Sequence, residues 1–326
     1  MLFLLFIRYN LIIEELKMEL RHLRYFITVA EELHFSRASE RLNIAAPTLT
    51  VQIQEIERVL SVRLFTRTKR SVTLTSAGKV FLDEARLVLD QYAKAESAGR
   101  RAGRGEIGRI EIGYVGSSAY AGVLQEQISR FTGRWPGVDI RARECPMEEL
   151  PKLIEEGQLD LGFVRLPMIY PSSLRSHILL RDVFCLAVCS GHPEAKQGAP
   201  LSPHELAGLK FVMPEQELGT YEVARRGRFP LDVIAKPGSL LSVLTQVSLG
   251  TGVSVIPSSV RNAVRLPNIE FRSIAGKPIT SEIAVLFRAE ESAPSARNFI
   301  QQIVQTPISM LGVEGQPQMN SDPTRI

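Results

Sequence analysis

The sequence predicts an α/β protein with an N-terminal winged helix-turn-helix, a long linker helix and a two-lobed C-terminal domain. Three short amphipathic helices and a basic hairpin occupy residues 18–76. A long helical pattern follows. From about residue 105 onward, strand and helix patterns alternate, which is typical of α/β folds.

Composition indicates a folded protein with a basic N-terminal region. The chain has 326 residues, 44% hydrophobic and 23% charged, which is enough for two or three units with proper cores. Its formal net charge is +4. Between residues 18 and 76, nine Arg or Lys residues stand against six Glu residues, a local charge of +3. The positive charge is therefore concentrated near the N-terminus.

Cysteine usage argues against a metal site. The chain has three cysteines, Cys145, Cys185 and Cys189, whose odd number and spacing fit neither a zinc site nor a disulfide framework. We expect no metal, no cofactor and a reducing cytoplasmic location. Cys185 and Cys189 would share one face of a strand and pack there, with redox sensing as the less favoured alternative.

The first residues, "MLFLLFI", resemble the apolar core of a signal peptide. They lack a preceding basic segment and a cleavage site, and Arg8, Tyr9 and Asn10 interrupt them too early for a membrane span. A patterned helix begins only at Met18. We therefore interpret residues 1–17 as a start-site extension, with a short membrane anchor as the alternative. No other stretch is expected to contact a membrane, and residues 311–326 are expected to form a flexible tail.

The third helix of the N-terminal domain has an apolar stripe and a polar face. Leu20, Leu23, Ile27 and Ala30 predict the first helix, and Ser36 can cap a second one. In "IAAPTLTVQIQEIE", the buried stripe is predicted to be Leu49, Ile53, Ile56 and Leu60. The opposite side carries Pro47, Val51, Gln54 and Arg58, flanked by Thr48, Thr50 and Gln52.

The stretch "RLFTRTKRSVTLT" predicts a two-stranded wing with a basic tip at residues 67–70. Basic side chains there can neutralise DNA phosphates, while the third helix can hydrogen-bond to base edges in the major groove. A solvated helix beside an Arg-rich turn is the alternative. The order of these elements within about sixty residues favours DNA binding.

A long helix capped by Thr75 or Ser76 is predicted through residue 99. It carries the apolar residues Val80, Ala85, Leu87, Leu89 and Tyr92, more than so slender an element can bury alone. Pairing with the same helix of a second copy would cover them, and packing on its own chain is the alternative. The stretch "GRRAGRGEIGR" that follows is interpreted as a linker.

Beyond the linker, alternating patterns predict two α/β lobes with a largely parallel sheet. Strands are expected at "RIEIGYVG", "VDIRARE", "LDLGFV", "VFCLAVC", "LKFVM", "LDVIAK", "GVSVIP" and "SEIAVLF", and helices at residues 119–131, 147–156, near 202–208, at 239–249 and at 294–305. Two such lobes enclose a crevice at strand ends. Ser117 and Ser118 follow one predicted strand end, while Pro214, Gln216 and Thr220 follow another.

The chain resembles the LysR-type transcriptional regulators from Met18 to about residue 305. The most specific pieces are "APTLTVQIQEIE" and "LFTRTKRSVTLTSAG", and "IEIGYVGSS", "EEGQLDLGFVR" and "LGTGVSVIPSS" are similar to the branch that controls aromatic-compound catabolism. The resemblance implies a periplasmic-binding-protein-like effector domain and a homotetramer that bends promoter DNA. It also implies that the tetramer changes its grip on the DNA when a small molecule binds between the lobes. It also makes RNA polymerase a candidate partner.

The resemblance also implies the DNA-contacting residues. These are Ser36, Pro47, Thr48, Thr50, Val51 and Gln52 for base reading, and Arg67 and Arg70 for the DNA backbone. Three positions depart from the family pattern: Ala46 stands where Gln is usual, Thr50 where Ser is usual and Val51 where Arg or His is usual. Because Ala46 and Val51 cannot form hydrogen bonds to base edges, operator recognition would depend more on methyl contacts and on DNA shape.

The effector-binding residues implied in the same way are Ser117, Ser118, Met147, Arg165, Pro214 and Thr220. Aromatic-responsive relatives often have Thr at the position of Met147, so one polar contact to the ligand would be missing. Ser117 could bind an effector carboxylate or only cap a helix. Arg165 could bind such a carboxylate bidentately or bridge the lobes, and bridging is favoured.

Enzymatic activity is not expected. The chain lacks the GxGxxG, GxxxxGK[ST], HExxH and GxSxG motifs, and its five histidines are scattered. The predicted function is a transcriptional regulator that responds to an aromatic acid or dicarboxylate. The alternatives are an α/β protein that binds or converts small acids and carries a DNA-binding domain, and an architectural DNA-binding protein indifferent to ligands.

The predicted domain boundaries follow from these patterns. The DNA-binding domain would span residues 18–76 and the linker helix with its hinge residues 77–104. The effector domain would span 105–310, with lobe I at about 105–181 and 281–310 and lobe II at about 182–280.

Overall fold

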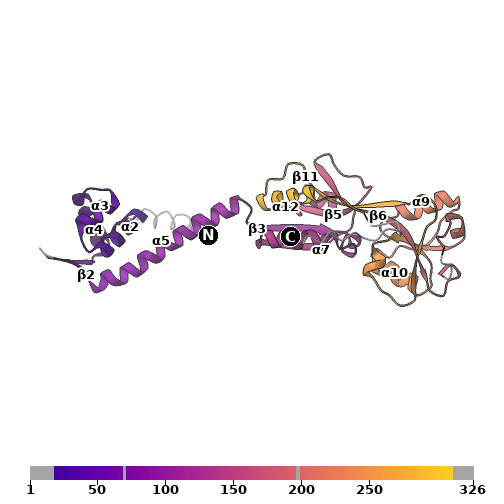
Figure 1. Ribbon diagram of the computed structural model, residues 1–326, viewed down its shortest axis with the longest axis horizontal. Coiled ribbons are helices and arrows are strands. Elements are labelled where there is room, and N and C mark those ends of the chain that lie inside the picture. Colours follow the sequence, from indigo (N-terminus) through magenta and orange to yellow (C-terminus); the bar gives the residue numbers. More distant parts are fainter. Residues whose placement is uncertain (1–17, 69–70, 196–198, 311–326) are drawn as a thin grey trace, which may run out of the picture. The chain divides into compact units, whose positions relative to one another are not determined.

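The computed structural model describes residues 18–68, 71–195 and 199–310 (Figure 1). The predictions for residues 1–17 and 311–326, and the position of Arg70, lie outside the described residues. The chain divides into two compact units between Arg100 and Arg101, and each is described by itself.

The first unit contains the three helices and the two-stranded wing that the sequence predicts. Its elements are α2 (Leu20–Glu32), α3 (Phe35–Leu42), α4 (Ala46–Leu60), β1 (Phe65–Arg67), β2 (Val72–Leu74) and the greater part of α5 (Ser76–Gly103). Strands β1 and β2 pair antiparallel, with Phe65 opposite Leu74. The core joins Phe26 of α2 to the wing through Phe65, with ring centroids 5.3 Å apart.

Helix α4 has the amphipathic pattern expected from its sequence. Leu49 and Ile53 have no exposed surface, and Ile56 is 1% exposed. Pro47 lies in the first turn, where a missing N–H costs nothing. The helix ends at Ser61, whose left-handed backbone has φ 54°. Burial of this stripe fixes which side of α4 faces outward.

The predicted cap of the second helix was wrong. Helix α3 begins at Phe35, and its N-cap is His34, whose Nδ1 accepts a hydrogen bond from the Arg37 N–H at 3.4 Å. Phe35 packs against Phe65 with ring centroids 6.1 Å apart, so the helix includes it. Ser36 therefore lies inside the first turn, exposed to solvent.

The buried carboxylate of Glu57 joins α4 to the wing. Its Oε1 accepts hydrogen bonds from the backbone N–H groups of Leu64 at 2.9 Å and Phe65 at 3.1 Å. Its Oε2 accepts from Arg67 Nη2 at 3.0 Å. The Arg67 guanidinium also lies over the ring of Phe35, 4.7 Å from its centroid. One carboxylate thus fixes the start of the first wing strand and the side chain that ends it.

Helix α5 begins as predicted and ends later than predicted. The Thr75 hydroxyl oxygen accepts a hydrogen bond from the Gly78 N–H at 2.9 Å, so Thr75 is the cap. A Cβ at Gly78 would lie 2.1 Å from the Leu64 carbonyl oxygen, so only glycine fits there. The predicted break at residue 99 was wrong because the helix continues to Gly103. Arg and Ala favour helix, and one interior glycine costs only about 1 kcal/mol.

The apolar side chains of α5 divide into two groups. Ala85 is 1% exposed and belongs to the core of the first unit, as one of the sequence alternatives requires. Val80 is 66% exposed and Leu87 is 61% exposed. Val88 and Tyr92 are exposed as well. Part of the helix is therefore covered by its own chain, and part is left open.

The second unit contains strands of both orientations. Its first lobe contains β3 (Ile107–Tyr114), α6 (Gly116–Tyr120), α7 (Val123–Arg134), β4 (Gly137–Glu144), α8 (Leu150–Glu155), β5 (Leu161–Leu166), part of β6 (Leu174–Cys189), β11 (Thr280–Arg288), α12 (Pro294–Gln305) and β12 (Ser309–Met310). Strand β3 is parallel to β4 and β5, whereas β11 is antiparallel to β5 and β6. Helices α7 and α12 cover one sheet face, and α8 packs on the other.

The second lobe is built around the last residues of β6. Its other elements are η1 (Pro193–Ala195), η2 (Pro203–Leu206), β7 (Lys210–Val212), α9 (Leu218–Gly227), β8 (Asp232–Ala235), α10 (Leu240–Ser248), β9 (Ser254–Pro257), α11 (Val260–Ala263) and β10 (Ile269–Ser273). Strand β6 pairs with β11 as far as Val183 and with β9 from Phe184 onward. Figure 1 shows α9 and α10 on this lobe, away from α7 and α12.

Several predictions for this unit were wrong in detail. The sheet is mixed rather than largely parallel, because β6 and β11 cross between the lobes side by side. The single helix expected at residues 119–131 is two helices, divided at Gly122 with φ 78°. The sequence missed α9, α11, β10 and β12 and predicted β6 too short at its start. The final helix, at residues 294–305, was predicted correctly.

We predict that Glu57→Ala lowers the free energy of unfolding of the first unit by about 3 kcal/mol, because two buried N–H groups lose their acceptor. Glu57→Gln keeps an amide oxygen at the same place and is expected to cost less. Calorimetry of the full chain measures the effect, with Glu40→Ala on the exposed side of α3 as control. Equal unfolding temperatures for Glu57→Ala and the control would contradict this role.

Candidate functional site

The outward side of α4 presents the residues that the sequence selects for base reading. Pro47, Thr48 and Val51 are exposed, Val51 by 59%. Gln52 is half-buried. The Thr50 hydroxyl donates to the Ala46 carbonyl at 2.9 Å, so toward a partner it can only accept. With Ser36 on α3, these side chains offer hydrogen-bonding and methyl groups on helices of one small domain.

The arginines near this side of α4 differ in how free their side chains are to bind a partner. Arg63 is exposed, just before β1. The Arg67 side chain is only 23% exposed because Glu57 and Phe35 hold it. Arg58 forms a two-bond pair with Glu55, at 2.8 and 2.6 Å. The fold thus pairs Arg67 with the buried carboxylate of Glu57 and Arg58 with the exposed carboxylate of Glu55.

A narrow cavity of about 40 Å³ lies between the two lobes of the second unit. Four predicted effector residues line it, namely Ser117, Met147, Arg165 and Pro214. The other two do not line it. Ser118 is fully buried and donates from its hydroxyl to the Val115 carbonyl at 2.7 Å, and Thr220 is fully buried within α9. Both residues therefore belong to the packing beside the cavity. Ser118 does so because its hydroxyl bonds to the backbone, and Thr220 because it is fully buried.

Arg165 bridges the lobes. It is 1% exposed, at the end of β5 in the first lobe. Its Nε donates to Ser117 Oγ at 2.9 Å, and its Nη2 donates to Asp182 Oδ2 at 3.4 Å. Nη2 also donates to Ser259 Oγ of the second lobe at 3.2 Å, and Nη1 donates to Ser281 Oγ at 2.9 Å. Of the two predicted roles for this residue, these contacts match the bridging one.

Asp182 is the counterpart of Arg165 at the crossing of β6. Its Oδ1 accepts from the Ser258 hydroxyl at 2.7 Å, and its Oδ2 accepts from the Ser259 hydroxyl at 2.6 Å. Burial lowers the pKa of the Arg165 guanidinium to about 10, although Asp182 opposes this shift. The guanidinium therefore stays charged near neutral pH, and the buried pair carries no net charge.

Two carboxylates that the sequence analysis did not select also line the cavity. Glu144 ends β4 and Glu215 follows Pro214. Glu215 Oε1 accepts a hydrogen bond from the Met147 N–H at 2.6 Å, which links the second lobe to the first. Burial raises the pKa of the Glu215 carboxyl, and Glu144 and Glu148 add to the rise. The sequence could have indicated these two residues by their position, because Glu144 is the last residue of β4 and Glu215 comes shortly after β7.

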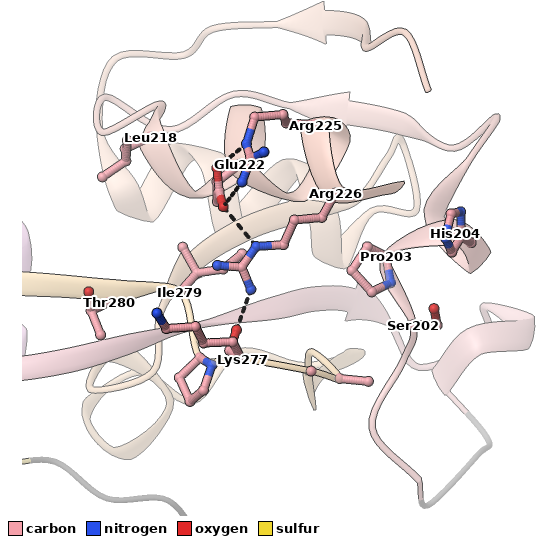
Figure 2. A pocket seen from close by; sticks show the side chains of 13 residues that line it. Ser202, Pro203, His204, Leu218, Glu222, Arg225, Arg226, Lys277, Ile279 and Thr280 are labelled. Carbon is pink, nitrogen blue, oxygen red and sulfur yellow. Dashed lines mark hydrogen bonds and ion pairs between the residues drawn. The ribbon is translucent and has the colours of Figure 1, made fainter. Parts of the chain in front are cut away.

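A larger hollow of about 770 Å³ lies on the second lobe (Figure 2). Glu222 of α9 accepts from Arg225 at 2.8 Å and from Arg226 Nε at 2.7 Å, and these arginines lower its pKa to about 2. Arg226 also donates to the Lys277 carbonyl, which ties α9 to the segment before β11. The hollow is open on one side and its arginines have partners, so it fits an effector less well than the interlobe cavity.

The cysteines match the packing interpretation. Cys185 lies in the core between β6 and α10, and burial raises the pKa of its thiol to about 12. A thiol with so high a pKa is almost entirely protonated and unreactive near neutral pH. Cys189 donates to the Ser248 carbonyl at 3.7 Å.

Within residues 18–68, 71–195 and 199–310, no three acidic, His or Cys side chains come together as a metal site would require. In the same part of the chain, no helix is both long and apolar enough to cross a membrane.

A winged helix-turn-helix followed by a two-lobed α/β unit defines a class of DNA-binding transcriptional regulators. Residues 20–79 match the family model of the bacterial regulatory helix-turn-helix protein, lysR family, and residues 103–307 match the LysR substrate binding domain. The chain therefore belongs to the LysR family of transcriptional regulators.

Individual relatives agree with this assignment. The HTH-type transcriptional regulator YnfL of Escherichia coli (strain K12) is 35% identical over 87% of this chain and 97% of its own length. The Hca operon transcriptional activator HcaR, also of Escherichia coli (strain K12), is 30% identical over 87% of this chain and 96% of its own. Families and relatives of this kind are regulators, so the chain is a regulator and not an enzyme.

A solved structure of full-length CbnR with its target DNA resembles most of the chain. Its TM-score is 0.75 at 26% identity, covering 89% of this chain and 99% of the CbnR chain. The predicted fold class is thereby confirmed.

We predict that Arg165→Met lowers the free energy of unfolding of the second unit by about 3–5 kcal/mol, because Asp182 is left as an unpaired buried charge. Trp135, the single tryptophan, lies in that unit, so its fluorescence reports the transition. Adding Asp182→Asn is expected to recover part of the loss. Arg175→Met removes an exposed arginine of β6 and serves as control. A loss no larger than in this control would rule out a bridging role.

Proposed function

We propose that this regulator inserts α4 into the major groove of promoter DNA and alters its grip when a small molecule binds between the lobes. The observation that carries the proposal is the outward side of α4, where polar and methyl-bearing side chains lie opposite a fully buried stripe. Such a face can read base edges and thymine methyl groups. The CbnR structure with its target DNA supports DNA as the partner.

Each predicted DNA residue has a proposed role. Pro47 and Val51 touch thymine methyl groups, while Thr48 and Gln52 hydrogen-bond to base edges. Thr50 accepts only, because its hydroxyl proton is engaged with Ala46. The sixth base-reading candidate, Ser36, reaches the duplex from α3. Position by position, the face relies on shape and methyl contacts more than on bidentate hydrogen bonds.

Phosphate contacts are proposed for the basic residues of the wing. Arg70 neutralises a phosphate directly, and exposed Arg63 adds to the local charge. Arg67 keeps a proposed backbone contact through Nη1, since Nη2 is bound to Glu57. Its larger effect is to hold the wing in position.

We further propose that the exposed part of α5 pairs with the same helix of a second copy. Val80, Leu87, Val88 and Tyr92 supply the apolar surface for that contact. A dimer would place two copies of α4 on a two-fold operator, and pairs of dimers would form the tetramer implied by the family resemblance. RNA polymerase is then the candidate partner for activation.

The class of effector is a separate proposal. The sequence resemblance predicts an aromatic acid or dicarboxylate, in line with the branch that governs aromatic catabolism. HcaR and CbnR are among the relatives, but their names do not identify a ligand for this chain.

Footprinting tests the proposed function. Protein from Met18 onward would be incubated at low ionic strength with the DNA upstream of its gene and of the divergent neighbour. We expect two protected half-sites about one helical turn, or a multiple of it, apart. An unprotected promoter would refute the proposal. Protection that no small molecule ever alters would favour a ligand-independent architectural protein instead.

We predict that Val51→Arg changes the preferred base at one position of each half-site, because arginine can bond guanine bidentately where valine offers only methyl groups. Selection from a randomised operator library measures the preference. Val62→Arg, an exposed substitution beyond the end of α4, is the control. Unchanged selection with Val51→Arg would refute this placement of α4.

We predict that Arg70→Gln weakens binding to all DNA sequences about equally and reduces the slope of log K against log salt concentration by about 1. Titrations at several salt concentrations, with operator and unrelated DNA, give both quantities. Lys152→Gln removes the same charge from the second unit and should leave the slope unchanged. A loss confined to the operator would show that Arg70 reads bases.

A further inference from the structure

The interlobe cavity contains an amide donor that the protein itself does not use. Gln216 lines the cavity and follows β7 in the second lobe. Its side chain as a whole is half-buried, but its Nε2 atom is buried and has no hydrogen-bond partner among the described residues. Its Oε1 accepts a hydrogen bond from the Ser281 hydroxyl at 3.2 Å. A buried N–H without an acceptor is costly, so the amide favours a partner that brings an acceptor oxygen.

The Ser281 hydroxyl sets the orientation of this amide. Arg165 Nη1 donates to Ser281 Oγ at 2.9 Å, and a guanidinium can only donate. The serine oxygen is therefore an acceptor toward Arg165, and its proton is left for Gln216 Oε1. With the amide turned over, that proton would lose its acceptor. The hydrogen-bond relay of Arg165, Ser281 and Gln216 thus keeps the amide oxygen on Ser281 and the NH2 group unused.

Arg165 adds a second unused N–H to the same relay. It is 1% exposed and lines the same cavity. Its contact with Asp182 is made by Nη2, at 3.4 Å. Nη1 therefore keeps a second N–H, besides the one that donates to Ser281, with no acceptor in the described part of the chain. Two side chains that line one cavity, Gln216 and Arg165, each retain a donor and offer no free acceptor there.

We propose that Gln216 determines the specificity of the interlobe cavity by donating from Nε2 to an acceptor oxygen of the effector, in a carbonyl or a carboxylate group. The proposal rests on the proposed function and names the group by which the effector is recognised. Ser281 acts as a positioning residue, because it holds the amide with its donor free. A ligand that offers only N–H donors leaves Nε2 unpaired, and a hydrogen-bonding site rejects such an analogue strongly.

The relay also links recognition to the spacing of the lobes. Arg165 belongs to β5 of the first lobe, whereas Gln216 lies in the second lobe, between β7 and α9. The cavity of about 40 Å³ holds no more than a few water molecules, so an organic effector enters when the lobes are further apart. Closure around a ligand oxygen gives Nε2 a partner, whereas closure around a donor group does not. The acceptor oxygen therefore favours the closed arrangement.

Three probes with one aromatic ring and different polar groups test this specificity on the full chain. Benzamide and benzoate present an acceptor oxygen, while benzylamine presents only N–H donors. Calorimetry measures the unfolding temperature of the second unit at constant ionic strength. We expect benzamide, benzoate or both to raise it by several degrees and benzylamine to leave it unchanged. A response to benzamide alone assigns a neutral carbonyl, and to benzoate alone a carboxylate. A shift with benzylamine, or with none of the three, overturns the proposal.

Variants of Gln216 separate the donor from the rest of the cavity. Gln216→Glu keeps an oxygen toward Ser281 and replaces the NH2 group by a second oxygen, so the responding probe should bind about ten-fold more weakly. Gln216→Met removes the donor without adding charge and is expected to weaken binding similarly. Gln125→Glu, on the exposed side of α7, should bind as the parent does. Parent-like binding by Gln216→Met overturns the proposal.

The positioning role of Ser281 has its own readout. Ser281→Ala lets the amide turn its oxygen toward the cavity, so the preference for the oxygen-bearing probe over benzylamine should fall. Ser281→Thr keeps a hydroxyl and should keep the preference. A merely structural role would weaken all probes alike, and an unchanged preference in Ser281→Ala would contradict the proposed orientation. Promoter footprinting without probes tests the proposed function separately, because DNA protection can persist when every probe fails.

Discussion

The buried ion pair between Arg165 and Asp182 is the constraint on which the second unit depends. It lies where β5 ends and β6 crosses between the lobes, and its hydroxyl partners come from both lobes. A buried pair of this kind contributes little net stability compared with apolar packing, but it is costly to break. Its value here is geometric, because it holds together the strand ends beside the interlobe cavity, which Arg165 lines.

The first unit uses a carboxylate in a comparable way. Glu57 holds two backbone N–H groups and one arginine, so the wing starts in a fixed place relative to α4. In both units a buried acidic side chain positions elements that carry function without itself facing a partner. Arginines that look alike in the sequence therefore have different roles. Arg67 and Arg165 hold the structure together, whereas exposed Arg63 remains free of any such buried contact.

The difference between buried, paired arginines and exposed arginines explains why the net charge of a region is a poor guide to its binding partner. A basic residue at a strand end suggests an anion site, although for Arg165 the sequence favoured a bridge between the lobes. Desolvation makes a buried arginine dependent on its own counter-ion, so its charge is already used within the protein. The family assignment rests on the pattern of both units and is unaffected. At the interlobe cavity, the charge of Arg165 is matched by Asp182 within the protein.

The sequence by itself determined most of the order of elements, the buried stripe of α4, the wing, the start of α5 and the last helix. These follow from local periodicity and capping, which need no distant contact. The family resemblance also selected four of the residues that line the cavity. Only the tertiary structure decided that β11 runs antiparallel to β5 and β6, that His34 caps α3, and that Ser118 and Thr220 are buried. Those outcomes depend on partners far away in the chain, such as Phe65 for Phe35 and Asp182 for Arg165, and no local pattern contains that information.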